Sequence, residues 1–233
     1  MNLIFDIGFN VGEFTQTCFN KYKDCNVIAV EANPNLVNSV SQHFFTNYNF
    51  SLLNNLVSDR EGEQLDFYIN PNASGISTAS TQFMENSRFT KGSKYIEENS
   101  TKWAAPIKVQ STTLDAMIER YGMPDLIKID VEGYEYNVLS GLTQKANDIC
   151  FEWHEEERDN LYKILEHLQS IGYNQFGVIG YFEEGNVFEK VTFSDKGDPY
   201  LQYPNNFYTL EDLELNKLIN PERRVNYGMF FAK

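Results

Sequence analysis

Basic residues are scarce in this sequence of 233 residues, which has 19 Lys and Arg against 33 Asp and Glu and a formal net charge of −14. A negative field of this kind repels phosphate backbones, so the composition argues against nucleic acid as a partner. The same charge would suit a cationic ligand, although ordinary solubility is a sufficient reason for it.

Cysteines and long apolar runs are also scarce. The three cysteines are scattered without metal-site spacing, and Cys18 and Cys150 fall on apolar faces, where we expect small core residues. An odd, sparse count is typical of a reducing compartment. No signal-peptide pattern precedes the first expected strand, and no apolar run approaches the ~20 residues that span a bilayer. We therefore expect a soluble, cytoplasmic protein without a membrane span.

Apolar strands and amphipathic helices alternate along most of the chain. Strands are expected at residues 3–5, 27–30, 50–58, 65–69, 107–110, 126–131, 149–153, 175–182, 187–193 and 229–232. The alternation predicts an α/β fold with a doubly wound parallel sheet. Gly185 and Asn186 predict a hairpin turn between two of the later strands. Because no linker interrupts the pattern, one domain spanning residues 1–233 is expected.

Residues 70–103 break this alternation. They are rich in Asn, Ser and Thr, with Phe83, Phe89 and Trp103 set among them. A segment of this length between regular elements is usually a lid or binding loop, or is disordered, and the aromatic residues argue that part of it packs. We expect an insertion at residues 70–106, which either covers a substrate or forms a surface excursion.

The first fifteen residues predict a strand, a tight turn and the start of a helix. Asp6 closes the apolar strand, and Gly8 and Gly12 bracket Asn10 in the turn. Glycine in such a turn lets a ligand approach the main chain and the helix N-terminus without meeting a Cβ. Glu31 ends the second strand about 20 residues later, the separation at which a Rossmann-type fold places a carboxylate on a ribose diol. The pattern indicates a nucleoside-bearing cofactor on this turn.

Three acids, Asp6, Glu31 and Asp130, each end an expected parallel strand. Ligands of such sheets bind beyond the carboxyl ends of the strands. Ionised carboxylates are costly to bury, so several at one edge indicate a solvated or ligand-filled cleft. For any one of them, a helix cap or a surface acid is the simpler interpretation.

The glycine pattern argues against a nicotinamide cofactor and an oxidoreductase. A dinucleotide fingerprint needs glycine at the first, third and sixth positions of the turn, which here hold Gly8, Asn10 and Glu13. Glu13 would also place a negative charge near a pyrophosphate. The set Asp6-x-Gly8-x-Asn10-x-Gly12 instead resembles the first motif of S-adenosylmethionine-dependent methyltransferases, whose cofactor has no phosphate and carries a sulfonium and an ammonium. Asn10 stands where many of these enzymes have glycine, so the turn must accommodate a side chain.

Later stretches resemble the FkbM methyltransferase family, over residues 3–156. The matching stretches are Val30-Glu31-Ala32-Asn33-Pro34, Val57-Ser58-Asp59 with Gly62, Ser74-Gly75-Ile76-Ser77, Thr113-Leu114-Asp115, Asp125-Leu126-Ile127-Lys128-Ile129-Asp130-Val131-Glu132-Gly133-Tyr134-Glu135 and Val138-Leu139-x-Gly141. The resemblance implies a class I methyltransferase fold, which is a Rossmann-like, mostly parallel seven-stranded sheet with an antiparallel terminal strand. It also implies methyl transfer from S-adenosylmethionine, with S-adenosylhomocysteine as product, to a hydroxyl of a sugar, glycan or natural product.

The resemblance also implies a set of binding residues. Those expected to bind the cofactor are Asp6, Gly8, Asn10, Gly12, Glu31, Ala32, Asn33 and Asp130. The resemblance ends at residue 156; apart from it, we expect residues 70–106 to be a lid or insertion and residues 175–233 to form the acceptor-side part of the domain. Aromatic residues such as Tyr200 and Tyr203 could stack on sugar faces or could simply belong to the core.

An alcohol is a poor nucleophile at neutral pH and needs a base near the reacting oxygen. His154 has the most suitable titration range, and Asp130 should reach the same sheet edge, so these two are the candidate bases. Glu132 is a candidate acceptor contact, and Glu152 could orient His154 or merely end its strand.

Other chemistries remain open at this stage. Asp130, Glu132, Glu152 and His154 offer ligands for a divalent metal that would lower the pKa of the acceptor, although we do not expect one to be required. A catalytically silent cofactor-binding module is the alternative from a different class.

Overall fold

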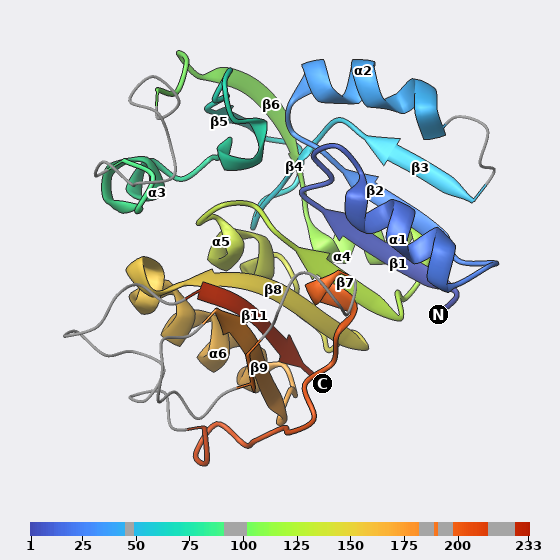
Figure 1. Cartoon of the computed structure of the whole chain (residues 1–233), viewed down its shortest axis with the longest axis vertical. Coiled ribbons are helices and arrows are strands. Elements are labelled where there is room, and N and C mark those ends of the chain that lie inside the picture. The colour runs from blue at the N-terminus through green and yellow to red at the C-terminus, as the bar shows by residue number, and fades with distance from the viewer. Residues whose placement is uncertain (45–48, 91–101, 182–188, 191–197, 214–226) are drawn as a thin grey trace.

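The computed structural model describes residues 1–44, 49–90, 102–181, 189–190, 198–213 and 227–233 (Figure 1). The strands of its main sheet are β1 (Leu3–Ile7), β2 (Asn26–Val30), β3 (Phe50–Leu53), β7 (Leu126–Ile129), β8 (Asp148–His154), β9 (Phe176–Tyr181), β10 (Glu189–Lys190) and β11 (Tyr227–Ala232). The helices are α1 (Glu13–Lys21), α2 (Pro34–Phe44), α3 (Thr81–Asn86), α4 (Leu114–Tyr121), α5 (Glu135–Ser140) and α6 (Arg158–Ser170), with short 3₁₀ turns η1 (Ser74–Ile76), η2 (Glu155–Glu157) and η3 (Pro199–Leu201).

The main sheet has the strand order β10-β9-β11-β8-β7-β1-β2-β3. Strands β3, β2, β1, β7 and β8 are parallel, and β11 runs antiparallel to both β8 and β9. This confirms the expected Rossmann-like, doubly wound sheet with its antiparallel terminal strand. The described part of the sheet also contains β10, a two-residue edge strand added to the seven that were expected.

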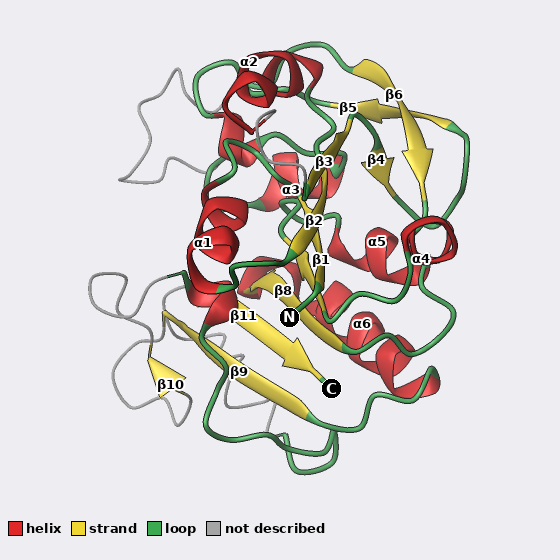
Figure 2. Cartoon of the chain, turned by 90° about the vertical axis from the view of Figure 1, so that its right-hand side faces the viewer, coloured by secondary structure: helices red, strands yellow, loops and turns green. Residues whose placement is uncertain are grey.

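Helices cover both faces of this sheet, with α1 and α2 on one side and α4, α5 and α6 on the other (Figure 2). This arrangement explains why β1, β2 and β7 are almost continuously apolar, because strands buried on both faces have no solvent side. Cys18 and Cys150 belong to the core on the α1 side, as predicted. Among the described residues, no helix has the length and apolar character needed to cross a membrane.

A second sheet of three strands has the order β4-β6-β5, formed by β4 (Leu56–Val57), β5 (Gln64–Phe67) and β6 (Ile107–Thr112). Residues 50–58, expected as one strand, are therefore divided between the two sheets. Two asparagines cause the break. The Asn54 side chain donates to the Glu31 carbonyl at 2.9 Å, and the Asn55 side chain donates to the Gln110 carbonyl at 3.1 Å.

The predicted hairpin near the C-terminus is wrong in its pairing. β10 lies parallel to β9, with Glu189 opposite Ile179, whereas a tight turn would reverse the chain and make the strands antiparallel. The turn at Gly185 and Asn186 lies outside the described residues.

The insertion expected at residues 70–106 is partly described, and those parts pack against the rest of the chain. Ser80 caps α3 by accepting a hydrogen bond from the Phe83 N–H at 3.0 Å. The Trp103 indole N–H donates to the Ile76 carbonyl at 2.8 Å, and the Phe83 side chain is fully buried. Residues 91–101 lie outside the description.

Candidate active site

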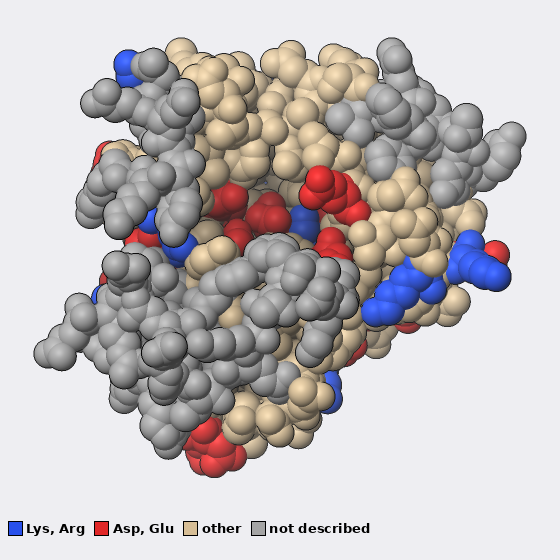
Figure 3. Space-filling view, viewed as in Figure 1, with Lys and Arg blue, Asp and Glu red and all other residues tan. Residues whose placement is uncertain are grey.

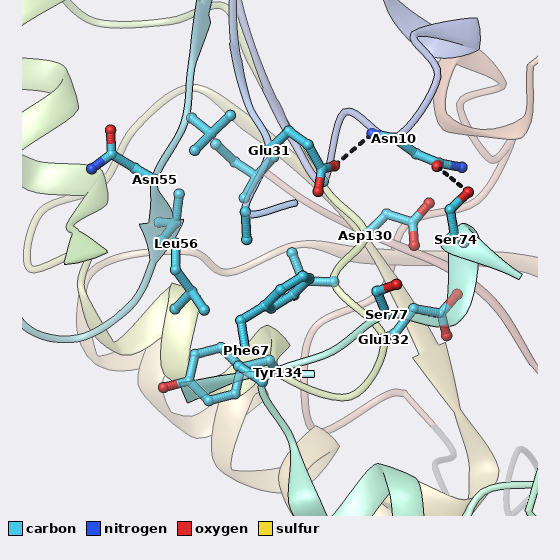
Figure 4. Close-up of a pocket in the computed structure, with 18 residues that line it drawn as sticks. Asn10, Glu31, Asn55, Leu56, Phe67, Ser74, Ser77, Asp130, Glu132 and Tyr134 are labelled. Atoms are coloured by element: carbon cyan, nitrogen blue, oxygen red, sulfur yellow. Dashed lines mark hydrogen bonds between the residues drawn. The ribbon is translucent and has the colours of Figure 1, made fainter. Parts of the chain in front are cut away.

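A pocket with an empty volume of about 740 Å³ lies at the carboxyl ends of β1, β2 and β7 (Figure 4). The space-filling view shows a hollow on this face, with acidic side chains gathered around it (Figure 3). Strand ends of a parallel sheet meet at one edge, so residues from distant parts of the chain converge here.

The turn after β1 places three residues in the left-handed region, with φ of 80° at Gly8, 48° at Asn10 and 85° at Gly12. Asparagine tolerates this region better than most residues with a side chain, which explains how Asn10 can replace a glycine. A Cβ on Gly8 would lie 1.8 Å from the Asp130 carbonyl oxygen. Gly8 therefore allows the turn to lie against the end of β7. From the sequence, we expected this glycine to give an approaching ligand clearance. The structure gives a different reason, which is the close approach of the Asp130 backbone.

Glu31 directly follows β2 and lines the same pocket. One carboxylate oxygen accepts the Asn10 backbone N–H at 2.8 Å, and the other accepts the Asn33 N–H at 2.7 Å. Burial raises the pKa of the Glu31 carboxyl, and these two N–H groups counteract the rise. Each oxygen retains a second lone pair, so a bound diol could donate to both. Ser74 of the insertion donates to the Asn10 side-chain oxygen at 3.0 Å and joins the two regions (Figure 4).

Lys128 is a site residue that the sequence analysis did not assign. Its side chain is 4% exposed, and its Nζ lies 3.1 Å from the Asp6 carboxylate and 3.7 Å from that of Asp130. It also donates to the Gly8 carbonyl at 2.7 Å. The signal was available: a lysine within an otherwise apolar buried strand needs an anionic partner, and acids end two neighbouring strands.

Asp6, Gly12 and Asn33 were expected to bind the cofactor. They line neither this pocket nor the second pocket described below, and instead hold the neighbouring backbone and side chains in place. Asp6 is fully buried and accepts the Thr15 hydroxyl at 2.6 Å as well as pairing with Lys128. Gly12 begins α1, and the Asn33 side chain accepts the Asn35 N–H at 3.0 Å at the start of α2. Ala32 lines the first pocket directly.

A second pocket, with an empty volume of about 680 Å³, adjoins the first and shares Gly8, Asn10 and Asp130 with it. Lys128 and Tyr200 also line it. Asp130 therefore stands at the junction of the two pockets, with a side chain that is 31% exposed. Burial raises the pKa of Asp130 to about 6, although Lys128 counteracts the rise.

Glu132 lines the first pocket from the turn between β7 and α5. Its φ of 55° is unusual for a residue other than glycine, and such strain persists where surrounding contacts enforce it. Here the Thr78 hydroxyl donates to the Glu132 carbonyl at 2.7 Å, and Phe83 packs over the following Gly133. Burial and repulsion from Glu152 hold the pKa of Glu132 well above its usual range.

His154 ends β8 and is 5% exposed. Its Nε2 lies 3.1 Å from Glu152 Oε2 and 3.7 Å from Glu132 Oε2, and its Nδ1 lies 3.3 Å from the Arg88 guanidinium. It lines a smaller recess with Glu152 and Glu135 rather than either larger pocket. Burial lowers the pKa of His154, but attraction to Glu152 outweighs this and leaves the pKa above its ordinary value.

The candidate metal ligands lie close together, but the neutral His154 ring carries its proton on the nitrogen that would have to bind the metal. Ligand atoms of Glu132, Glu152 and His154 lie within 4.8 Å of one another. An arginine can only donate, so its contact with Nδ1 is a hydrogen bond only when Nδ1 has no proton. A neutral imidazole then carries its proton on Nε2, the nitrogen that faces the two carboxylates. A histidine that binds a metal needs the opposite arrangement, with the free nitrogen on the metal and the other nitrogen donating.

Three solved methyltransferase structures align with this chain. A solved precorrin-6y C5,15-methyltransferase from Geobacter metallireducens GS-15 aligns with 11% identity and a TM-score of 0.44, covering 100% of this chain and 78% of that one. A structure described as StiE O-MT residues 961–1257 aligns with 10% identity and a TM-score of 0.46, covering 100% and 67%. The plantazolicin methyltransferase BpumL in complex with SAH aligns with 8% identity and a TM-score of 0.40, covering 100% and 76%.

These identities and TM-scores are low, and the family assignment depends on the sequence alone. A comparison with curated proteins gave no match. A family model described as the methyltransferase FkbM domain matches residues 6–175. This range is most of the chain and includes the pocket-lining ends of β1, β2 and β7 and the acidic turn after β7. The chain belongs to the FkbM methyltransferase family.

Proposed function

We propose that this methyltransferase transfers the methyl group of S-adenosylmethionine to a hydroxyl oxygen of a sugar, glycan or natural product. One observation carries the proposal: the pocket that holds Glu31 and a second pocket lined with acids share a single wall, formed by Gly8, Asn10 and Asp130. A methyl donor that spans this wall would present its reactive centre next to Asp130.

The first pocket fits the nucleoside part of the donor. Glu31 offers two oxygens for the ribose diol, and Leu56, Phe67 and Tyr134 provide apolar and aromatic surface for the base. The acids around the shared wall suit a group that carries a sulfonium and an ammonium. When bound, this cofactor supplies an already activated methyl group, so the protein has mainly to align the two reactants.

The base is assigned to Asp130. With the donor bound, the Asp130 carboxylate would accept the proton of the acceptor hydroxyl as its oxygen takes the methyl group, with S-adenosylhomocysteine as the other product. A base is most effective when its pKa is close to the working pH, and a carboxyl with a pKa of about 6 satisfies this condition. Glu132 is assigned to contact with the acceptor.

His154, the other candidate base, is assigned an indirect role. Both of its ring nitrogens have partners, and it stands behind the acids that line the pockets. Residues 70–106 are assigned as a cover over the acceptor, and residues 175–233 as part of the acceptor side, within one domain over residues 1–233. Support for the cover comes from Thr78 and Phe83, which pack on the turn that carries Glu132.

A labelled-methyl assay tests this function. The full chain is incubated with S-adenosylmethionine carrying an isotope-labelled methyl group and a panel of glycans and small alcohols, and the products are read by mass spectrometry. We expect label on the oxygen of at least one hydroxyl-bearing acceptor, and labelling about 10²–10⁴-fold slower with Asp130→Asn. If calorimetry shows that the cofactor binds and no acceptor is labelled, the alternative of a silent cofactor-binding module is favoured instead.

A further inference from the structure

We propose that Arg88 is a positioning residue that fixes the protonation pattern of the His154 ring. In this role it keeps the proton on Nε2, where the ring can hold the Glu152 carboxylate beside the acceptor. The effect on catalysis depends on the function proposed above, whereas the effect on the ring itself does not.

Arg88 is fixed in place by Glu156. Its Nε lies 3.0 Å from Oε1 and its Nη2 lies 3.0 Å from Oε2, and its backbone N–H also donates to Oε1 at 3.0 Å. The two side chains are only 19% and 14% exposed. The guanidinium also lies 4.5 Å from the centre of the Tyr227 ring. A forked pair with this support holds the arginine in one orientation, which a single surface contact would not do.

The same guanidinium reaches the histidine. Arg88 Nη2 lies 3.3 Å from His154 Nδ1, and every polar hydrogen of a guanidinium is a donor. Nδ1 must therefore accept, and the proton of the neutral ring is left on Nε2. Protonating Nδ1 would set two donors against each other and bring two positive charges together.

The contacts of Nε2 show the consequence of keeping the ring proton on that nitrogen. Nε2 lies 3.1 Å from Glu152 Oε2, so an Nε2–H donates to that oxygen. Glu132 Oε2, at 3.7 Å from the same nitrogen, is buried and has no hydrogen-bond partner among the described residues. If Nε2 lost its proton, its lone pair would face two carboxylates. Arg88 thus acts through His154 on the acids that line the acceptor region.

Nitrogen NMR of the histidine rings tests this inference directly. The chain has three histidines, so long-range proton–nitrogen correlation spectra of ¹⁵N-labelled protein are simple, and His154→Gln identifies the signal. Because the pKa of His154 is above its ordinary value, the spectra are recorded at a pH where the ring is neutral. There we expect wild-type protein, without cofactor, to show Nε2 protonated and Nδ1 unprotonated. A neutral wild-type ring with its proton on Nδ1 overturns the inference, and this measurement needs no variant that could fail to fold.

Variants then distinguish the positioning role of Arg88 from a general effect of removing a positive charge. In Arg88→Met we expect Nδ1 to gain a proton, and in Arg88→Lys, which keeps a charged donor, we expect partial rescue. Arg158→Met is the matched control, because it removes the same charge from an exposed residue at the start of α6 and should leave the ring unchanged. An unchanged ring in Arg88→Met, with circular dichroism showing a native fold, contradicts the inference.

The effect of Arg88 on catalysis is measured separately from its effect on the His154 ring. For an acceptor found in the labelled-methyl assay, we expect Arg88→Met to lower kcat on the order of tenfold while the cofactor Kd is unchanged. If the NMR result is as expected and no acceptor is ever labelled, the proposed function fails but the role of Arg88 toward His154 stands. If kcat falls while the ring is unchanged, Arg88 acts by another route and the inference fails.

Discussion

The Glu31 side of the site and the His154 side are built from contacts of very different range along the chain. On the Glu31 side, the carboxylate binds backbone groups that are 2 and 21 residues away. On the His154 side, the contacts of Thr78 with Glu132 and of Arg88 with His154 and Glu156 join residues that are 54, 66 and 68 apart. The Glu31 contacts lie within the segment β1–α1–β2 and the start of α2, and Ser74 of the insertion adds one hydrogen bond to Asn10. The His154 side, in contrast, exists only when the insertion folds back.

This difference suggests a division of labour. The Glu31 side should control the affinity for the cofactor, and the side that holds Asp130, Glu132 and His154 should control the rate of transfer. Lys128 connects the two sides, because it contacts the turn after β1 and the acid after β7.

Asp130→Asn should have the largest effect. Loss of a general base lowers the rate of methyl transfer by about 10²–10⁴-fold, with a much smaller effect on cofactor affinity. A base works when deprotonated, so the wild-type rate should rise with pH through the Asp130 pKa of about 6 and level off above it. Rates measured across pH with a labelled acceptor check this. Asp66→Asn, an exposed acid, is the control. Loss of affinity without loss of rate would break the proposed division.

Lys128→Met should destabilise the fold by about 3–5 kcal/mol, because Asp6 is then a buried charge without its cation. Lys108→Met is the matched control. Lys108 pairs with Asp66 at 2.9 Å, but the two side chains are 60% and 45% exposed, so the loss should be about 0–1 kcal/mol. Chemical denaturation of the two variants gives the comparison. Equal losses would show that the buried pair is not the connection between the two sides.

Glu31→Ala should weaken cofactor binding by about 1.5–3 kcal/mol, the worth of hydrogen bonds to a charged group. Titration calorimetry measures the change, and the rate at saturating cofactor should fall far less than in Asp130→Asn. Because Glu31 also binds two backbone N–H groups, thermal unfolding must confirm that the variant is folded. Unaltered affinity in a folded variant would remove Glu31 from the ribose site.

Chelation should have the smallest effect. Since the Arg88 contact leaves the Nε2 of His154 protonated, we expect methyl transfer to be unchanged after treatment with a chelator and dialysis. Activity lost on chelation and restored by magnesium or manganese would support the metal-assisted alternative, and would mean that the His154 side works by a different chemistry.

Several sequence interpretations failed for identifiable physical reasons. Residues 50–58 were expected as one strand because the apolar pattern ignores Asn54 and Asn55, whose side chains bind backbone carbonyls and turn the chain into a second sheet. The expected hairpin pairing of β10 with β9 was wrong. A Gly-Asn pair predicts a local chain reversal, whereas the parallel pairing in the structure does not depend on the residues of one turn. The role of His154 as a base stays a prediction. It came from the titration range of histidine, which contains no information about the groups that the structure places beside the two ring nitrogens.

The sequence alone determined the order of strands and helices, the turn after β1 and the position of Glu31, because each depends on apolar periodicity and turn residues within a short window. It also indicated that acids gather at one sheet edge, since parallel strands end together. Only the tertiary structure decided that Lys128 pairs with the buried Asp6 and that Arg88 reaches His154. Those contacts join residues that no local pattern relates, and they form because burial leaves each charge with no solvent to replace its partner.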